Sequence, residues 1–401
     1  MSSFKRRTPS AQTALPSTRI SAHNSTVLTS TGVPSVDELL GGGLPLHTSL
    51  LIHEDRFTGY AKLLLSYYLA QGIASSNAVC LATAEEEPEA VVRSLMGVVE
   101  GKVPSEMKEE EDEDISTSAV GGGIGGRRMG AVREEEDRMR IAWRYQGLPK
   151  FNTAFGGGRR DANSQQPFCN LFDLTKRMAP AMLNAAGPRM ALLDVSVWAA
   201  EAEEQGGKNV YERLLEHIEG LVDEGGFRIR PNAPPPPTVL RIAIHSISSP
   251  IWGRSSTADL ARFLHSLRAI LRTSYATAVL TLPQTSSPQT STLLAHLSDA
   301  VLRLDSFAGS STPVHPAYES QYHGFLDVIK VPRVGCLGGR KGEVGMLGFK
   351  VRRKRFLVER CSLPPEGEGV GRGDEEETRR KAPVNKGGCG SGGGGSSVLD
   401  F

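Results

Sequence analysis

The sequence predicts an α/β fold in which helices cover both faces of a central, mostly parallel sheet. Short runs that are apolar at nearly every position, such as Thr48–Ile52 and Thr238–Ile247, alternate along the chain with longer segments of helical spacing. Strands without a polar face are buried on both sides, which is typical of parallel sheets between two helix layers. No internal repeat interrupts this alternation.

The first expected elements lie between residues 27 and 83. Residues 1–26 are polar and poor in aromatic side chains, so we expect them to be disordered. Ser35 can cap a short helix that Gly41–Gly43 then ends. The strand Thr48–Ile52 follows, and a helix over Ala61–Gln71 and a strand over Asn77–Thr83 come next.

Two segments between residues 100 and 170 differ from the rest in composition. Residues 101–138 carry the acidic run Glu109–Asp114 and the glycine cluster Gly121–Gly126, and residues 156–166 are again rich in glycine and polar side chains. Such composition predicts solvated, flexible insertions.

The second half continues the alternation. The segments Phe168–Met178 and Val210–Gly225 are interpreted as helical, and the strongest helix has apolar residues from Leu260 to Leu271 at helical spacing. Further strands are expected at Ala276–Pro283, Asp299–Phe307, Gly324–Arg333 and Leu347–Arg360. Residues 364–401 are interpreted as a disordered tail, which leaves a single domain over 27–363.

Bulk properties exclude several classes of protein. The formal net charge of +1 gives no global attraction to nucleic acid, so a binding surface must come from local clustering. The five cysteines have no paired spacing, which predicts reduced thiols in the cytoplasm or nucleus. No apolar run is long enough to span a membrane, and the first residues do not resemble a secretory signal.

Residues 53–65 stand where a nucleotide-binding protein has its phosphate loop, between a buried strand and a long helix. That loop has the pattern G-x-x-x-x-G-K-[ST], in which backbone amides and lysine bind phosphate and the hydroxyl binds Mg²⁺. With Gly59 as the second glycine, the first glycine position holds Glu54, the lysine position holds Tyr60 and the hydroxyl position holds Ala61. The sequence therefore predicts a degenerate loop that does not hold ATP by itself.

The position at which such a protein has its metal ligand has also lost the required residue type. In a recombinase-like ATPase the third strand ends in an aspartate that holds Mg²⁺, and here the corresponding run ends in His245 followed by Ser246. Imidazole is a poor substitute for a carboxylate on this hard cation. We therefore predict no catalytic residue, no metal site and no cofactor bound by this chain alone.

An ordered set of blocks resembles one known family, the fourth subunit of the Elongator complex, also called the paired-box-neighbour family. The blocks are Thr29–Asp55, Ile141–Pro149, Phe172–Met178, Leu240–Gly253, Phe263–Pro283, Tyr322–Arg333, Phe349–Glu366 and the terminal Leu399–Phe401. The insertions depart from the family pattern and fall at expected surface loops.

The resemblance implies a RecA-like fold with degenerate ATPase motifs. It also implies a hetero-hexameric ring with the fifth and sixth Elongator subunits, association with the Elongator catalytic subcomplex, and tRNA binding in support of wobble-uridine (U34) modification. The implied locations are the cytoplasm and the nucleus, away from membranes.

Two surface roles are weighed against ordinary packing. The basic run Lys350, Arg352, Arg353, Lys354 and Arg355 is a candidate tRNA contact, or else a charged strand or hairpin. Trp252 is a candidate anchor at a ring interface. The aromatic and basic residues Trp143–Tyr145 could stack on RNA, although core packing is the stronger interpretation.

Two other functions remain open from sequence. An active ATPase would have to recruit Lys62 and Glu85–Glu87 in an unusual geometry. A recombinase paralogue acting on DNA would need basic loops after its strands, and the segment Leu282–Thr292 carries neither lysine nor arginine.

Overall fold

The computed structural model describes residues 15–21, 24–99, 167–205, 208–231, 233–253, 256–310, 314–335 and 345–361. The predicted insertions at 101–138 and 156–166, the tail 364–401 and Trp143–Tyr145 lie outside the described residues. Among the helices that are described, none is long and apolar enough to cross a membrane.

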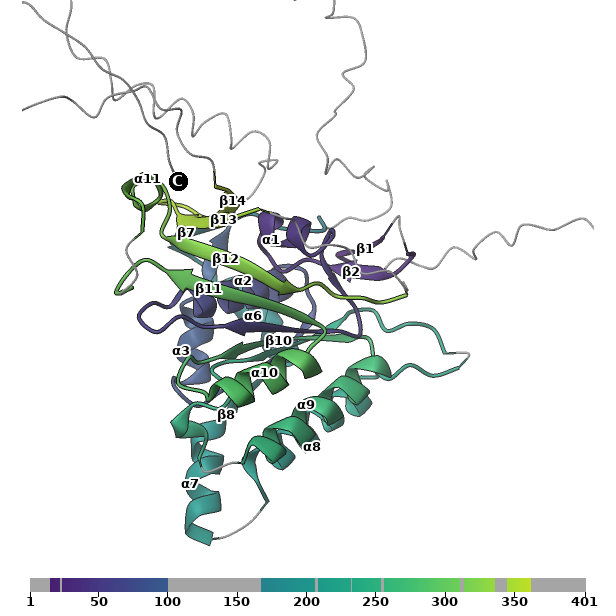
Figure 1. Ribbon diagram of the computed structural model, residues 1–401. Coiled ribbons are helices and arrows are strands. Elements are labelled where there is room, and N and C mark those ends of the chain that lie inside the picture. Colours follow the sequence, from purple (N-terminus) through teal and green to yellow (C-terminus); the bar gives the residue numbers. More distant parts are fainter. Residues whose placement is uncertain are drawn as a thin grey trace, which may run out of the picture. The chain divides into compact units, whose positions relative to one another are not determined.

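Nine strands of the described chain form one sheet (Figure 1). The strands from β11 to β8 run parallel, and β12, β13 and β14 extend the sheet antiparallel. This arrangement confirms the predicted α/β class with a mostly parallel sheet, and it is consistent with a RecA-like fold. In spatial order the strands are β14 (Phe356–Arg360), β13 (Leu347–Val351), β12 (Gly324–Lys330), β11 (Ala300–Ser306), β4 (Ser49–His53), β10 (Ala276–Leu282), β9 (Leu240–Ile244), β5 (Ala78–Thr83) and β8 (Met190–Asp194).

Helices cover both faces of this sheet, as the uniformly apolar strands predicted. In β4, Leu50 and Ile52 join one apolar cluster and Leu51 joins the other, because successive side chains of a strand point to opposite faces. The first cluster contains residues of α1 (Pro34–Leu39), α2 (Tyr60–Ala74), α3 (Pro88–Arg93) and α6 (Pro180–Ala186). The second contains residues of α7 (Val195–Gln205), α8 (Val210–Glu224), α9 (Thr257–Arg272) and α10 (Pro288–Leu297).

Two segments differ from the sequence-based expectation. The segment expected as one strand over Leu347–Arg360 is a hairpin, β13 and β14, because Arg352 and Arg355 exchange backbone hydrogen bonds around a tight turn. The segment interpreted as a helix around Phe172 is a strand, β7 (Phe172–Arg177), which pairs with β6 (Met96–Val98). Strand β7 forms because it pairs with a segment that is distant along the chain, which a local pattern does not indicate.

Structure also begins earlier than predicted. Strand β1 (Thr18–Ile20) pairs antiparallel with β2 (Val27–Thr29), which in turn pairs with β3 (Leu44–Pro45). The expectation of disorder for residues 1–26 is therefore wrong for β1, although the sequence shows no apolar pattern there. The remaining short helix is α11 (Pro316–Glu319).

A buried guanidinium joins the small sheet to the large one. Arg241 of β9 is 1% exposed and donates hydrogen bonds to Thr29 Oγ1 at 2.8 Å and to the carbonyl of Ser30 at 2.7 Å. Its charged carbon lies 4.0 Å from the ring centre of Tyr68 on α2. Gly72 of α2 faces the same side chain, and a Cβ there would lie 2.9 Å from Arg241 Cδ, so only glycine lets this helix approach so closely.

We expect Arg241→Ala to lower the free energy of unfolding by about 3 kcal/mol, because it leaves two buried acceptors unpaired and a gap beside Tyr68. Urea denaturation followed by circular dichroism measures this change. Arg228→Ala is the matched control, since Arg228 makes its ion pairs at the surface, and the expected cost there is below about 1 kcal/mol. Equal costs for the two variants would contradict the joining role of Arg241.

Candidate functional site

The strand, loop and helix expected of a phosphate loop are present at the middle of the sheet. Strand β4 ends at His53, the loop covers 54–59, and α2 begins at Tyr60, one residue earlier than predicted. The carboxyl ends of β10, β9 and β5 lie along the same edge of the sheet. In α/β sheets this edge is where ligands bind. Glu54, Tyr60, Ala61 and His245 therefore lie at the same edge of the sheet.

Glu54 is held by a hydroxyl group from a neighbouring strand end. Its two carboxylate oxygens accept from Ser246 Oγ at 2.9 and 3.1 Å, and its backbone amide donates to the carbonyl of Leu282. The backbone amide of Ser246 donates to Thr281 Oγ1 at 2.7 Å. A carboxylate is thus fixed at the entrance to the loop, where a phosphate loop has a glycine.

His245 stands behind this contact and is 5% exposed. Its Nδ1 lies 3.3 Å from Thr83 Oγ1, and its backbone amide donates to the carbonyl of Ala82. Burial lowers the pKa of His245, and Lys62 lowers it further, while Glu54 and Glu85 act in the opposite direction. A neutral imidazole carries no negative charge. His245 therefore does not replace the carboxylate that a hard cation such as Mg²⁺ prefers.

Tyr60 and Ala61 turn the start of α2 into a packing surface. The Tyr60 ring meets Phe349 edge-on at a centroid distance of 4.8 Å and lies 6.1 Å from His323. Burial raises the pKa of Tyr60, and Asp55 raises it further, so the phenol stays neutral. Ala61 is 1% exposed and provides no hydroxyl. The aromatic ring packs against β13 where a phosphate loop has its lysine.

The loop conformation does not depend on its remaining glycine. Gly59 has φ −97°, which any residue adopts, and a Cβ there would meet no atom within 4 Å. Gly32 is a contrasting case, because its φ is +92° and a Cβ would lie 2.5 Å from the carbonyl oxygen of Tyr67. The glycine of a working phosphate loop lets the backbone approach the ligand closely, and Gly59 shows no such constraint.

The charged side chains around the loop are mostly acidic. Lys62 forms an ion pair with Glu86, so the nearest lysine is already engaged by a carboxylate. Asp55 accepts from Thr58 Oγ1 at 2.6 Å within the loop. Glu85–Glu87 are exposed beyond the end of β5. Within the described residues, no group of three His, Cys, Asp or Glu side chains is placed to hold a metal ion.

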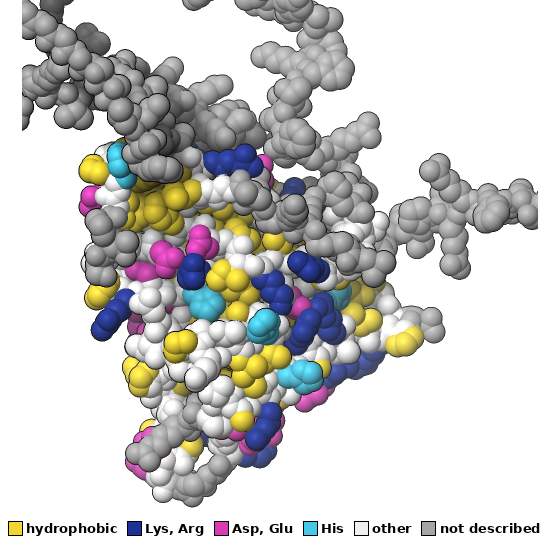
Figure 2. All heavy atoms as spheres, viewed as in Figure 1, with side chains coloured by type: hydrophobic (Ala, Val, Ile, Leu, Met, Phe, Trp, Pro, Cys, Tyr) yellow, Lys and Arg dark blue, Asp and Glu magenta, His cyan; other side chains and the backbone are white. Residues whose placement is uncertain are grey.

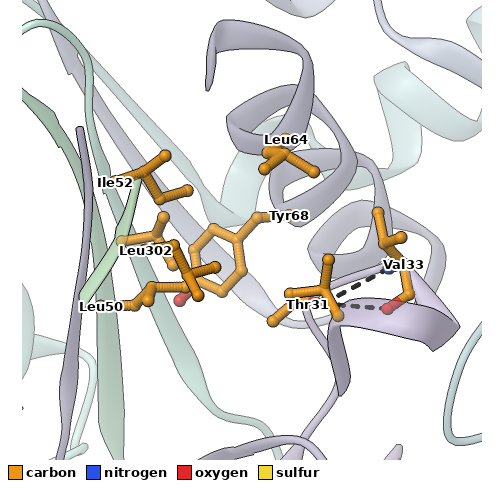
Figure 3. A pocket seen from close by; sticks show the side chains of 9 residues that line it. Thr31, Val33, Leu50, Ile52, Leu64, Tyr68 and Leu302 are labelled. Atoms are coloured by element: carbon orange, nitrogen blue, oxygen red, sulfur yellow. Dashed lines mark hydrogen bonds between the residues drawn. The ribbon is translucent and has the colours of Figure 1, made fainter. Parts of the chain in front are cut away.

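A cavity between α2 and β4 is too small for a nucleotide (Figure 3). Its volume is about 10 Å³, and Leu50, Ile52, Leu64 and Tyr68 point into it. A space of this size accommodates at most one water molecule. Its apolar lining makes it a packing gap in the core.

The predicted basic run is a hairpin turn with only part of its charge available. Lys350 has a side chain 13% exposed, forms an ion pair with Glu359 and lies over the Tyr322 ring. The carbonyl of Lys354 accepts from the backbone amide of Leu174 on β7. Arg353 and Lys354 are the exposed members of the run, while Arg352 and Arg355 are half-buried.

Trp252 lies in the core and not on a surface. It is 1% exposed and stacks on Tyr211 of α8, with the two rings 5.6 Å apart and 10° from parallel. This burial contradicts the interface role predicted for Trp252, since an anchor must be accessible to its partner. Its neighbour Ile251 is 50% exposed, and no periodic pattern in the sequence distinguishes the two.

Sequence reasoning missed two features of the site. Ser246 was noted only as the residue after the metal position, and its hydroxyl is the group that holds Glu54. Phe57 is 62% exposed, and Arg56 lies 5.5 Å from its ring centre. The signal for Ser246 was its place at a strand end adjacent to β4, which requires the strand order to be known.

Comparison with known proteins adds an independent finding. The chain matches the PAXNEB protein family over residues 11–392. It is 35% identical to Elongator complex protein 4 of Xenopus laevis, across all of this chain and 95% of the frog protein. Identity to the human protein of that name is 32%, across all of this chain and 94% of the human one. The Danio rerio protein is 32% identical over 91% of this chain and 88% of its own length.

We expect Gly59→Ala to change the free energy of unfolding by less than about 0.5 kcal/mol, because the backbone angle and the surrounding space accept a methyl group. Gly32→Ala is the contrast, with an expected cost above about 2 kcal/mol from the left-handed angle and the clash with Tyr67. Chemical denaturation of both variants measures the difference. A large loss in Gly59→Ala would show that the loop conformation still requires glycine.

The stability of the chain should depend on pH through His245. Because burial lowers its pKa, the unfolded chain takes up a proton at higher pH than the folded chain does. Stability is therefore lost as the pH falls below about 6.5, the unfolded-state value. In His245→Gln the decline between about pH 6.5 and 5 should be shallower, as measured by urea midpoints. His53, whose pKa burial also lowers, is present in both proteins and cancels in the comparison.

Proposed function

The chain belongs to the PAXNEB protein family, and from this membership we propose that it is a non-catalytic subunit of the Elongator complex. The observation that carries the proposal is that relatives named Elongator complex protein 4 match essentially the whole chain. A match over the full length, including both ends of the sheet, supports a shared role better than a match to one motif. Its proposed locations are the cytoplasm and the nucleus.

In this proposal the chain assembles with the fifth and sixth Elongator subunits into a hetero-hexameric ring. The ring binds tRNA and supports modification of the wobble uridine, U34, by the catalytic subcomplex. The parallel sheet is the element that supports this assignment within the described residues, because it is consistent with the RecA-like architecture that the resemblance implies.

The arrangement at the carboxyl edge supports a structural role without nucleotide turnover. Glu54 places a carboxylate beside the loop, and Tyr60 packs against Phe349. A phosphate brought close to Glu54 would meet repulsion of several kcal/mol at the partly shielded dielectric of such a cleft. Lys62, the cation that an unusual ATPase would need, is paired with Glu86. The proposed subunit therefore binds no nucleotide by itself.

The first test is a calorimetric titration of the purified full chain with Mg·ATP, alone and then together with the fifth and sixth subunits. We expect no saturable heat from the chain alone at millimolar nucleotide. We also expect one assembly of all three chains by light scattering. The carboxylate at Glu54 and the ring at Tyr60 are the physical reasons for the absence of binding.

The titration separates the proposed function from its alternative. Saturable micromolar binding by the chain alone would contradict the non-catalytic role and indicate an ATPase with an unfamiliar loop. Failure of the three chains to assemble, with relatives of the same chains assembling under identical conditions, would contradict the ring. A chain in which Tyr60→Phe and Glu54→Gln are combined is a useful control, because it keeps the packing and removes the repulsive charge.

A further inference from the structure

A cluster of basic side chains lies on the face of the molecule that α9, α10 and β12 share. We call it the basic surface and define it by Arg268, Arg272, Lys330 and Arg333, with His47, His265 and His296 at its border. Figure 2 shows Lys, Arg and His side chains gathered on this face, over α9 and α10. Its members come from segments far apart in the sequence.

The basic surface lies at the end of the sheet opposite the phosphate loop. His47 precedes β4, and Asp299 precedes β11, so both mark the amino ends of parallel strands. Arg272 donates to the carbonyl of His47 at 2.9 Å, which connects α9 to this end. The acidic carboxyl edge, with Glu54 and Glu85–Glu87, is therefore separated from the basic surface by the length of the strands.

One buried carboxylate organises two guanidinium groups. Asp299 has a side chain 4% exposed, and its Oδ1 lies 2.6 Å from Arg272 and 3.1 Å from Arg268. Its Oδ2 accepts from the backbone amide of Ser49 at 3.1 Å. A single negative charge thus orients two positive ones, and both arginine side chains keep more than a third of their area exposed, at 40% for Arg268 and 35% for Arg272.

Lys330 adds a third cation, and Arg333 follows it three residues along the chain. Its ammonium donates to the carbonyls of Ala295, His296 and Ser298 at the end of α10, and Ser298 is adjacent to Asp299. Burial lowers the pKa of Lys330, and the nearby Arg268 and Arg333 lower it further, against the opposite effect of Asp299. Arg268 and Arg333 therefore lie close enough to Lys330 for their charges to interact.

Acidic side chains are scarce on these elements. Helix α10 has none. The sole acidic residue of α9 is Asp259, which pairs with Arg262 at the amino end of the helix, and the sole one of β12 is Asp327, which pairs with Arg303. Asp299 offsets only one of the four cations of the basic surface. A chain of almost neutral net charge thus presents a concentrated positive region.

The chemistry of the basic surface suits a polyanion better than a folded protein. Protein interfaces depend on exposed aromatic or apolar anchors. The one large exposed apolar residue on these three elements is Ile329, a single side chain at an irregularity of β12, and it has no aromatic or apolar neighbour of comparable exposure on them. Guanidinium groups held in place by a buried carboxylate are well prepared for phosphate oxygens.

We propose that the basic surface binds the phosphate backbone of a structured RNA, and that it is the principal RNA contact of this chain in place of the run Lys350–Arg355. The inference rests on the proposed role in tRNA handling and assigns that role a surface. In the hairpin run, only Arg353 and Lys354 are exposed, and Lys350 is engaged by Glu359. The basic surface differs from that run in its support, because the buried carboxylate of Asp299 holds two of its guanidinium groups in place.

The test uses the full chain, alone and in the reconstituted assembly, with a fluorescent tRNA transcript as the probe. The variant Arg268→Gln/Arg333→Gln removes two cations and leaves the contact between Arg272 and Asp299 in place. We expect affinity for the transcript to fall on the order of tenfold near 0.1 M salt. The slope of log affinity against log salt should become shallower by about 1.5, since two phosphate contacts are lost.

Arg353→Gln/Lys354→Gln is the matched control, because it removes the same charge from the hairpin turn. It should change affinity less than twofold, and thermal unfolding should show both variants to be folded. A second variant, Arg333→Glu, keeps the experiment informative if the double variant is unstable, because the Arg333 side chain is exposed at the edge of the surface.

The experiment separates failure of the basic surface from failure of the proposed tRNA role. Unchanged affinity in the double variant, with the wild type binding, overturns the basic surface alone, and loss only in the hairpin variant restores the basic run. Absence of binding by the wild type, alone and assembled, overturns the tRNA role together with its surface. Loss of assembly with retained tRNA affinity identifies the surface as a protein contact and also overturns the proposal.

Discussion

The buried guanidinium of Arg241 is the constraint on which the rest of the structure depends. It joins β9, the helix that follows the loop and the chain entering from the small sheet, through Tyr68, Thr29 and Ser30. A buried charge is tolerated only where hydrogen bonds and a polarisable ring compensate for lost hydration. Because the partners come from three elements, satisfying this one group constrains where α2 lies and therefore where the loop at 54–59 ends.

With α2 and the loop at 54–59 in this position, side chains of the chain itself fill the carboxyl edge of the sheet. Ser246 binds the carboxylate of Glu54, Tyr60 packs on Phe349, and Lys62 meets Glu86. Lys62, which could bind a phosphate, is paired with a carboxylate. Glu54, which would repel a phosphate, is held in place by a hydroxyl group. The amino edge has the opposite character, since Asp299 gathers Arg268 and Arg272 at a surface. Separation of opposite charges across one sheet lets the chain have little net charge and still present a local positive field.

Much of the fold could be predicted because it follows from local pattern. The strands Ser49–His53 and Leu240–Ile244 are uniformly apolar, and α9 has both a capping box at Ser256 and a continuous apolar stripe. The misses have different causes. Strand β7 depends on a partner remote in sequence, the hairpin depends on a tight turn between Arg352 and Arg355, and Trp252 lies inside while Ile251 lies outside within a single 3-10 turn over Pro250–Trp252.

The amino-acid order alone predicted that the phosphate loop is degenerate at Glu54, Tyr60 and Ala61, because a loop between a strand and a helix is a local unit. It predicted the altered metal position at His245 in the same way, from the end of one apolar strand. It also determined the family, through blocks spread along the chain. The folded arrangement decided that Ser246 holds Glu54 and that Gly59 is unconstrained. It likewise decided that Arg268, Lys330 and Arg333 form one surface. These features arise from contacts between segments far apart in sequence, and no local periodicity encodes which side chains a sheet brings together.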